Sequence, residues 1–175
     1  MQAPAEIIHI LWDGPFTFDE IATFTTPTDF GIYQIYGHHP VYGSDVMLYI
    51  GLAERNRFGT RIPNHEWWLE NHDDGRIRVY LGRLAGVVQP SDDEWNRHIR
   101  LAERLLIHAH YPACNTKKSL GALEPALQNV HVCNWGRVAD LLPEVSGVRW
   151  GSKRPNVNIY SEASNDGPAA PTGNG

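Results

Sequence analysis

The sequence predicts an α/β fold of the α+β type, in which a three-stranded antiparallel sheet is flanked by helices. Three segments rich in β-branched and aromatic residues have the composition or the alternating polarity of strands. Two further segments place apolar or capping residues at helical positions, and the predicted order is strand, strand, helix, strand, helix. A small sheet with helices packed against it is the natural way to bury the apolar side of every element.

The three strands are expected at residues 30–36, 46–50 and 76–84. The intervening residues 38–45, with three glycines and prolines in or beside them, predict a turn, so the first two strands form a hairpin. The third segment alternates, with Ile77, Val79 and Leu81 on one side and polar or amphipathic residues on the other. This period of two is typical of a half-buried strand.

Two helices complete this core. The first is expected over residues 60–71, because Thr60 is an acceptable N-cap and Pro63 is tolerated only in a first turn. The second is expected over residues 92–110, where Ser91 and Glu94 have the spacing of a capping box and Pro112 follows the end. Apolar residues recur along one side of this second helix: Trp95, Ile99, Ala102, Leu106 and Ala109.

The chain divides into a core at residues 29–118 and two extensions. Residues 1–28 form an N-terminal extension with a candidate strand at 7–12. Residues 119–160 form a C-terminal extension packed on the core, with a short helix near 123–129 and a strand at 130–134. Residues 161–175 are small, polar and rich in Pro and Gly, which predicts a disordered tail.

Composition and charge argue against several classes of protein. No apolar run reaches the roughly 20 residues of a membrane-spanning helix, and no export signal is recognised. The two cysteines, Cys114 and Cys133, have no metal-ligand spacing, so reduced thiols in a cytoplasmic protein are expected. The formal net charge of -5 argues against a nucleic-acid partner, but residues 51–118 hold eleven basic and nine acidic residues. A local basic face is therefore still compatible with DNA.

Two tripeptides carry the strongest functional signal. Gly31-Ile32-Tyr33 lies in the first predicted strand, Tyr49-Ile50-Gly51 lies in the second, and Arg61 follows ten residues later. This pattern resembles the GIY-YIG nuclease superfamily. The spacing of Glu103 and Asn115 resembles that of the small restriction endonucleases of that superfamily. The resemblance covers residues 30–115, about half of the chain. Each tripeptide alone is weak evidence, and their order together with the later polar residues is much stronger.

The resemblance implies a set of site residues: Tyr33, Tyr49, Arg61, His65, Glu103 and Asn115. Glu103 would be the metal ligand, and the expected ion is Mg²⁺, for which Mn²⁺ can substitute. One carboxylate is enough for Mg²⁺ when water and phosphate oxygens complete its octahedral shell. Arg61 and His65 are four residues apart, so on a helix they can contact the same phosphate.

The two tyrosines can divide the remaining chemistry in two ways. A free tyrosine has a pKa of about 10, so a general base would need a nearby cation to lower it. We expect Tyr33 to deprotonate or position the attacking water, with His65 assisting, and Tyr49 to hydrogen-bond the phosphate. The reverse assignment stays open. Taken singly, the two tyrosines, Arg61 and Glu103 are better explained by ordinary structural roles. Their joint occurrence in this order favours the nuclease interpretation.

The expected function is therefore a metal-dependent endonuclease that hydrolyses DNA phosphodiester bonds. A restriction-type enzyme that acts as a homodimer fits, since a symmetric pair of sites would cut both strands. One alternative is a structure-specific nuclease of repair or recombination. Another is a catalytically silent nucleic-acid-binding module with the same fold. No structural zinc is expected, because the histidine pairs at 38–39 and at 108 and 110 lack partners with suitable spacing.

Overall fold

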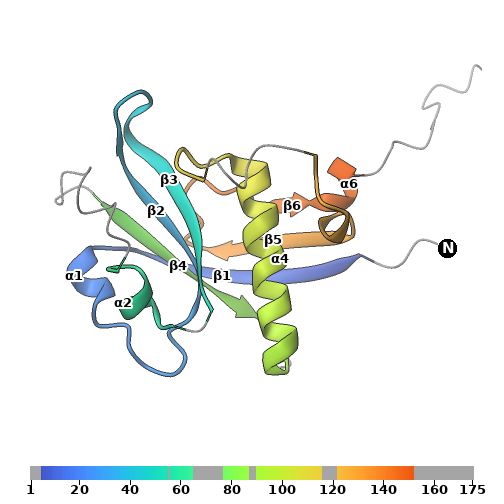
Figure 1. Ribbon diagram of the computed structural model, residues 1–175, viewed down its shortest axis with the longest axis horizontal. Helices are drawn as coiled ribbons and strands as arrows, with labels where there is room; N and C mark the ends of the chain where they lie inside the picture. The colour runs from blue at the N-terminus through green and yellow to red at the C-terminus, as the bar shows by residue number, and fades with distance from the viewer. Residues whose placement is uncertain (1–4, 55, 65–76, 87–89, 116–121, 152–175) are drawn as a thin grey trace, which may run out of the picture.

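The computed structural model describes residues 5–54, 56–64, 77–86, 90–115 and 122–151. Within these ranges one six-stranded mixed sheet curls into a half-barrel, and the strand order is β3-β2-β4-β1-β5-β6 (Figure 1). The strands are β1 (Glu6–Phe16), β2 (Gly31–His39), β3 (Gly43–Ala53), β4 (Arg78–Ala85), β5 (Val130–Gly136) and β6 (Glu144–Ser146). The helices are α1 (Phe18–Ile21), α2 (Phe58–Arg61), α4 (Asp92–His110), the 3-10 helix η2 (Pro125–Leu127) and α6 (Gly147–Gly151).

The predicted three-stranded antiparallel sheet flanked by helices is wrong. The three expected strands exist as β2, β3 and β4 and pair antiparallel, but β1 pairs antiparallel with β4 and parallel with β5. The sheet thus continues through both segments expected to be extensions. The physical reason is the pattern of β1: Ile8, Ile10 and Trp12 are all buried, and a strand buried at the centre needs partners on both edges.

Helix α4 lies across one face of the sheet and has the predicted bounds (Figure 1). The Ser91 hydroxyl accepts a hydrogen bond from the Glu94 backbone N–H at 3.3 Å, and Tyr111 ends the helix in the left-handed conformation. The predicted stripe faces the sheet: Ile99, Ala102 and Leu106 are buried, with Trp95 and Ala109 packed beside them. Each fully buried Ile or Leu side chain contributes about 1.5–3 kcal/mol to folding.

A second apolar cluster fills the opposite face of β2, β3 and β4. Its members include Tyr33 and Ile35 from β2, and Phe58 and Ile62 from α2 and the turn that follows it. Because successive side chains of a strand point to opposite faces, Ile32 of β2 faces α4 while Tyr33 faces α2. Strand β2 is therefore buried on both faces, and Tyr33 lies in the core.

The remaining expectations have mixed outcomes. Helix α2 begins at Phe58 and its described residues pass into a turn at 62–64, while the rest of the predicted helix and the tail at 161–175 lie outside the described residues. The strand expected at 130–134 is confirmed within β5, and η2 falls within the short helix expected near 123–129. In the described part of the chain, no helix combines the length and apolarity required to cross a membrane.

Candidate active site at the edge of strand β3

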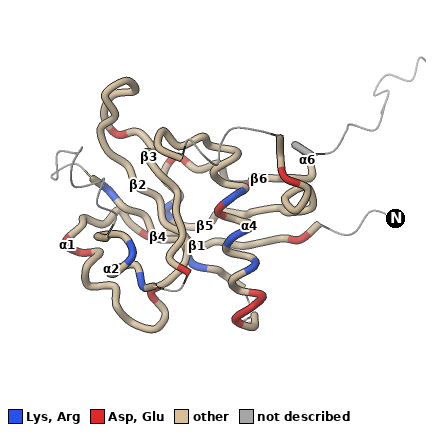
Figure 2. The backbone as a smooth tube through the Cα atoms, in the orientation of Figure 1, with Lys and Arg blue, Asp and Glu red and all other residues tan. Residues whose placement is uncertain are grey.

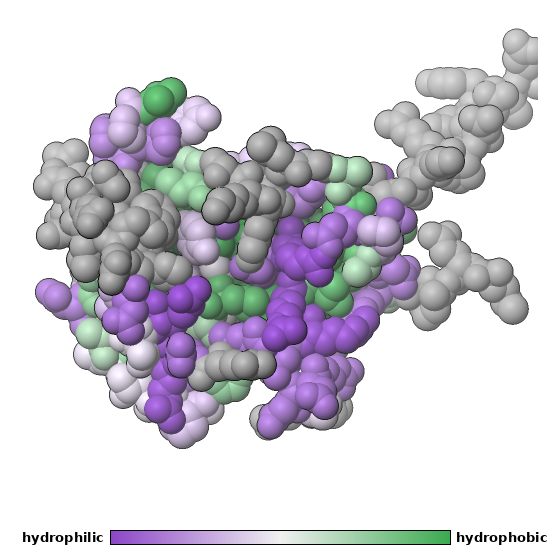
Figure 3. Space-filling view, in the orientation of Figure 1, coloured by the Kyte–Doolittle hydropathy of each residue, from purple (hydrophilic) through white to green (hydrophobic). Residues whose placement is uncertain are grey.

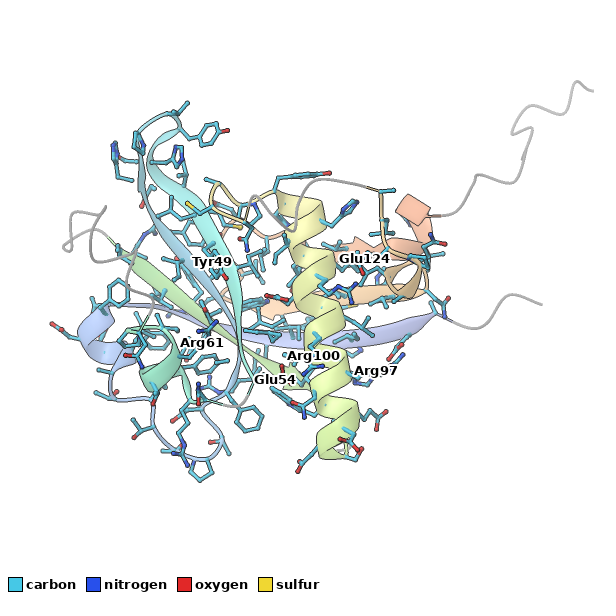
Figure 4. The ribbon with its side chains drawn as sticks, in the orientation of Figure 1. Tyr49, Glu54, Arg61, Arg97, Arg100 and Glu124 are labelled. Carbon is cyan, nitrogen blue, oxygen red and sulfur yellow. The ribbon has the colours of Figure 1, made fainter. Side chains whose placement is uncertain are left out.

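A cavity of about 480 Å³ lies where β3, α2 and α4 meet. Strand β3 is an edge strand of the sheet, and its residues Tyr49 and Leu52 line part of the cavity. Figure 4 shows Arg61 and Tyr49 on one side of β3 and Arg100 reaching toward Glu54 from α4. We call this space the β3 cavity, and its lining residues are Tyr49, Leu52, Glu54, Asn56, Arg61, Arg100, Glu103 and Arg104.

Arg61 reaches the β3 cavity from the last residue of α2. The short helix is anchored to the preceding loop, because the backbone N–H of Phe58 donates to the Asp29 carbonyl at 2.8 Å and that of Gly59 donates to the Phe24 carbonyl at 2.9 Å. The Arg61 Nε in turn donates to the carbonyl of Leu52 at 3.2 Å. These contacts fix the guanidinium beside the end of β3.

Glu103 reaches the same cavity from the middle of α4. Its residue is only 4 % exposed, although it is a carboxylate on a helix with a solvent-facing side. Arg100 lies one turn before Glu103, and its Nε donates to Glu54 at 2.9 Å. Arg104 is the next residue after Glu103, and its Nε donates to Glu124 at 3.2 Å. Glu103 therefore sits in a wall rich in guanidinium groups.

The charges around β3 are mainly basic on the face that carries the cavity. Figure 2 shows basic residues at α2 and just before it on one side of β3 and basic residues of α4 on the other, and Figure 3 shows hydrophilic residues gathered over both helices. The β3 cavity itself is lined by three arginines and two glutamates. The local balance is thus positive even though the chain has a formal net charge of -5, as a phosphate site requires.

Tyr33 and Tyr49 lie on the same face of the β2–β3 hairpin. Their ring centroids are 6.1 Å apart with 31° between the ring planes. Tyr49 lines the β3 cavity, whereas Tyr33 is 0 % exposed behind it. Burial raises the pKa of the Tyr33 hydroxyl well above its ordinary value; Tyr49 and Glu103 act in the same direction, and Arg61 opposes them. The Tyr33 hydroxyl is therefore protonated at neutral pH and can serve as a hydrogen-bond donor.

The glycines of the two tripeptides make room for this arrangement. A Cβ at Gly51 would lie 2.5 Å from Cζ of Tyr33 and 2.5 Å from Cε1 of Tyr49, so the two rings occupy the space a side chain would need. Gly31 has a φ of +153°, and a Cβ there would lie 2.1 Å from the carbonyl oxygen of Gly82 on β4. Gly51 is thus required by close packing of the tyrosine pair, and Gly31 by the close approach of β4 and by its positive φ.

Asn115 supports the site from outside the cavity. Its Oδ1 accepts from the backbone N–H of Ile50 at 2.8 Å, and its Nδ2 donates to the Ile50 carbonyl at 2.9 Å. The backbone N–H groups of Ala113 and Cys114 donate to the carbonyls of Met47 and Leu48, at 3.1 Å and 2.8 Å. The segment after α4 therefore pairs with the free edge of β3 and holds the strand that carries Tyr49.

The structure brings three of the six predicted site residues together around one cavity: Tyr49, Arg61 and Glu103. Tyr33 and Asn115 do not line it, and His65 lies outside the described residues. Sequence reasoning missed Glu54 and Arg100. A signal for Arg100 was present, because it precedes Glu103 by three residues and such pairs share a helical face. No comparable signal marks Glu54.

The donor set fits a hard divalent cation. Glu103 places a carboxylate in the cavity wall, and the cavity has room for the water molecules that Mg²⁺ retains. Glu103 lies in the cavity wall on the middle of a long helix and is 4 % exposed, so its carboxylate is held in a fixed position. Glu103 could hold the ion, and phosphate oxygens and water would complete its shell.

Comparisons with known proteins yield no match: no family model, no curated protein and no solved structure matches the chain. Any activity of the chain is therefore inferred from the residues that line the β3 cavity and from their geometry.

Proposed function

We propose that the chain is a divalent-metal-dependent endonuclease that hydrolyses DNA phosphodiester bonds in the β3 cavity, and that it acts as a restriction-type enzyme. The observation that carries the proposal is the meeting of Tyr49, Arg61 and Glu103 on one cavity, from three segments far apart in the sequence. Phosphodiester hydrolysis needs charge stabilisation at phosphorus, a positioned water and help for the leaving oxygen. A guanidinium, a phenol and a carboxylate can divide these tasks.

Arg61 is the phosphate-binding residue in this proposal. Its planar guanidinium presents a fork of N–H donors that matches two phosphate oxygens. The bond from Nε to the Leu52 carbonyl orients the plane before substrate arrives. Preorganised donors of this kind stabilise developing negative charge without reorganising during the reaction.

Glu103 would hold Mg²⁺ at the opposite wall. When bound, the ion supplies Lewis-acid stabilisation of the phosphate and lowers the pKa of a coordinated water. The chain's own contribution is the fixed position of the carboxylate, which α4 packing anchors: Ala102 beside it and Leu106 one turn later are both fully buried. A rigid helix holds a ligand more accurately than a loop does.

We assign the contact with water or phosphate to Tyr49 and a positioning role to Tyr33. This is the reverse of the assignment that we expected from the sequence, which left both possibilities open. Tyr49 lines the cavity, while Tyr33 is fully buried with a raised pKa and packs against Gly51. A protonated hydroxyl in the core can orient its neighbours through hydrogen bonding, but it cannot accept the proton of an attacking water.

The direct test is incubation of the purified chain with supercoiled plasmid DNA and Mg²⁺. We expect nicked and linear products that require the metal and disappear when EDTA is added. A discrete set of fragments supports the restriction form of the proposal. Cleavage confined to forks or flaps would replace it with a structure-specific nuclease, and no cleavage of any DNA or RNA by folded protein would overturn the enzyme proposal.

The two tyrosine assignments lead to a separate prediction. Tyr49→Phe should lower the initial cleavage rate about 100-fold or more, the range for loss of a positioned proton-handling group. Tyr33→Phe should lower it less than about tenfold, because the buried ring remains and only its hydroxyl is removed. The rates are measured on the same plasmid at saturating Mg²⁺, after circular dichroism has shown both variants folded. A larger loss for Tyr33→Phe would return the base role to Tyr33.

Two further parts belong to the same proposal. A homodimer is included because one site cuts one strand, and a symmetric pair would cut both strands of a palindrome. A cytoplasmic location is included because Cys114 and Cys133 are both free thiols. Sedimentation of the chain with and without an uncleavable DNA duplex tests the dimer.

A further inference from the structure

A second group of ligand-type side chains lies at the other end of the sheet. His131 and Cys133 are two residues apart on β5, so their side chains share one face. Glu144 on β6 is the register partner of Cys133. One ligand atom from each residue lies within 4.8 Å of the other two, and among the described residues this is the one group of three or more such side chains.

The distances within this group are close to those of a metal site. Ligand atoms around a tetrahedral Zn²⁺ lie about 3.5 Å apart, because the bonds to nitrogen, oxygen and sulfur are about 2.0–2.3 Å long. His131 Nε2 and Glu144 Oε2 are already 3.6 Å apart. The Cys133 sulfur lies within 4.8 Å of both atoms, so a shift of about 1 Å would bring it to the same separation.

The ligand types select a different ion from the one expected in the β3 cavity. Imidazole nitrogen and thiolate sulfur suit borderline ions such as Zn²⁺ and Co²⁺, whereas Mg²⁺ prefers oxygen ligands alone. We propose that His131, Cys133 and Glu144 bind one Zn²⁺-type ion, with three protein ligands and water in the fourth position. The site goes beyond the proposed nuclease function and does not depend on it.

The surroundings favour a cation here. Cys133 and Glu144 face each other as register partners on β5 and β6, so a bound cation would lie between a thiolate and a carboxylate. The side chains of His131 and Glu144 are 24 % and 68 % exposed, so an ion can enter from solvent.

A bound ion would strengthen a weak edge of the sheet. Strand β6 has only three residues, and it pairs with β5 alone. Ligands from both strands would cross-link them, and an ion that binds only the folded chain raises its stability. The site lies on β5 and β6, whereas the β3 cavity lies at the opposite edge of the strand order. The two metal sites are therefore separable by experiment.

The test uses Co²⁺ as a spectroscopic probe on the reduced, metal-free full chain. We expect one Co²⁺ per chain to produce a near-ultraviolet thiolate-to-cobalt charge-transfer band together with the visible bands of tetrahedral cobalt. Added Zn²⁺ should abolish both. Cys133→Ser should lose the charge-transfer band, and Cys114→Ser, the matched control, should keep it. Absence of the band in the wild-type chain, or an unchanged band in Cys133→Ser, would overturn the proposal.

A second measurement guards against a variant that fails to fold. Glu144 is well exposed, so Glu144→Gln should fold normally. In competition with a chelator, this variant should bind Zn²⁺ at least about tenfold more weakly than wild type, because it loses a carboxylate that contacts the ion. Zn²⁺ should also raise the melting temperature of the wild-type chain more than that of Glu144→Gln. Equal affinities and equal shifts would contradict the assignment, whatever the nuclease assay shows.

Discussion

Replacing Glu103 by glutamine should reduce DNA cleavage about 1,000-fold or more while leaving the chain folded. The side chain keeps its shape, so the buried packing of α4 is retained, but the negative charge that would hold Mg²⁺ is removed. A metal ion contributes several kcal/mol of transition-state stabilisation, and each 1.36 kcal/mol corresponds to a factor of about ten in rate. A loss of about 4 kcal/mol therefore accounts for three orders of magnitude.

The measurement compares plasmid cleavage rates of wild type and Glu103→Gln across a range of Mg²⁺ concentrations. Glu94→Gln is the matched control, because Glu94 lies on the same helix with a side chain 55 % exposed and does not line the β3 cavity. It should cleave at the wild-type rate. Thermal melting should place both variants within a few degrees of wild type. If Glu103→Gln cleaved at more than a tenth of the wild-type rate, Glu103 would not be the metal ligand.

Elements whose sequence pattern is local were predictable. Helix α4 has its cap residue, its apolar stripe and its terminating Pro112 within one stretch of chain, and its bounds are confirmed. The β2–β3 hairpin was indicated in the same way. The size of the sheet was not predictable, because β1 pairs with β5 across more than a hundred residues and no local pattern encodes that partner. The alternating apolar residues Ile8, Ile10 and Trp12, all of which are buried, indicated that β1 belongs to the sheet.

The residues of the candidate site also divide into those that could be predicted from the sequence and those that could not. The resemblance to GIY-YIG nucleases implied Tyr49, Arg61 and Glu103 as site residues, and these three line one cavity. The burial of Tyr33 was not foreseen, because a strand pattern does not tell which side of a sheet a second helix will cover. The hydrogen bonds from Asn115 to Ile50 depend on where the chain returns after α4. His131, Cys133 and Glu144 escaped notice because their nearness depends on the pairing of β5 with β6.

Substituting alanine for Gly51 should destabilise the fold and disable the site together. The new Cβ would lie 2.5 Å from atoms of both tyrosine rings, which are held by the core and by β3. Overpacking of this kind costs about 1–3 kcal/mol. For a chain of this size we expect a melting temperature lower by roughly 4–10 °C. Because relief of the clash must move Tyr33 or Tyr49, the cleavage rate should also fall by at least about tenfold.

Gly37→Ala separates a specific effect at Gly51 from a general intolerance of alanine in the hairpin. Gly37 lies on the neighbouring strand. The nearest atom to a Cβ there would be Cδ1 of Leu48 at 2.9 Å, the far end of a side chain, and Cγ1 of Ile77 would be at an ordinary contact distance of 3.7 Å. Leu48 can change rotamer, so this variant should melt within a few degrees of wild type and cleave normally. If the two variants lost stability equally, the tyrosine pair would not be the reason for Gly51. If Gly51→Ala lost stability but cleaved normally, the exact position of the two rings would not matter for catalysis, and the role assigned to Tyr49 would fail with it.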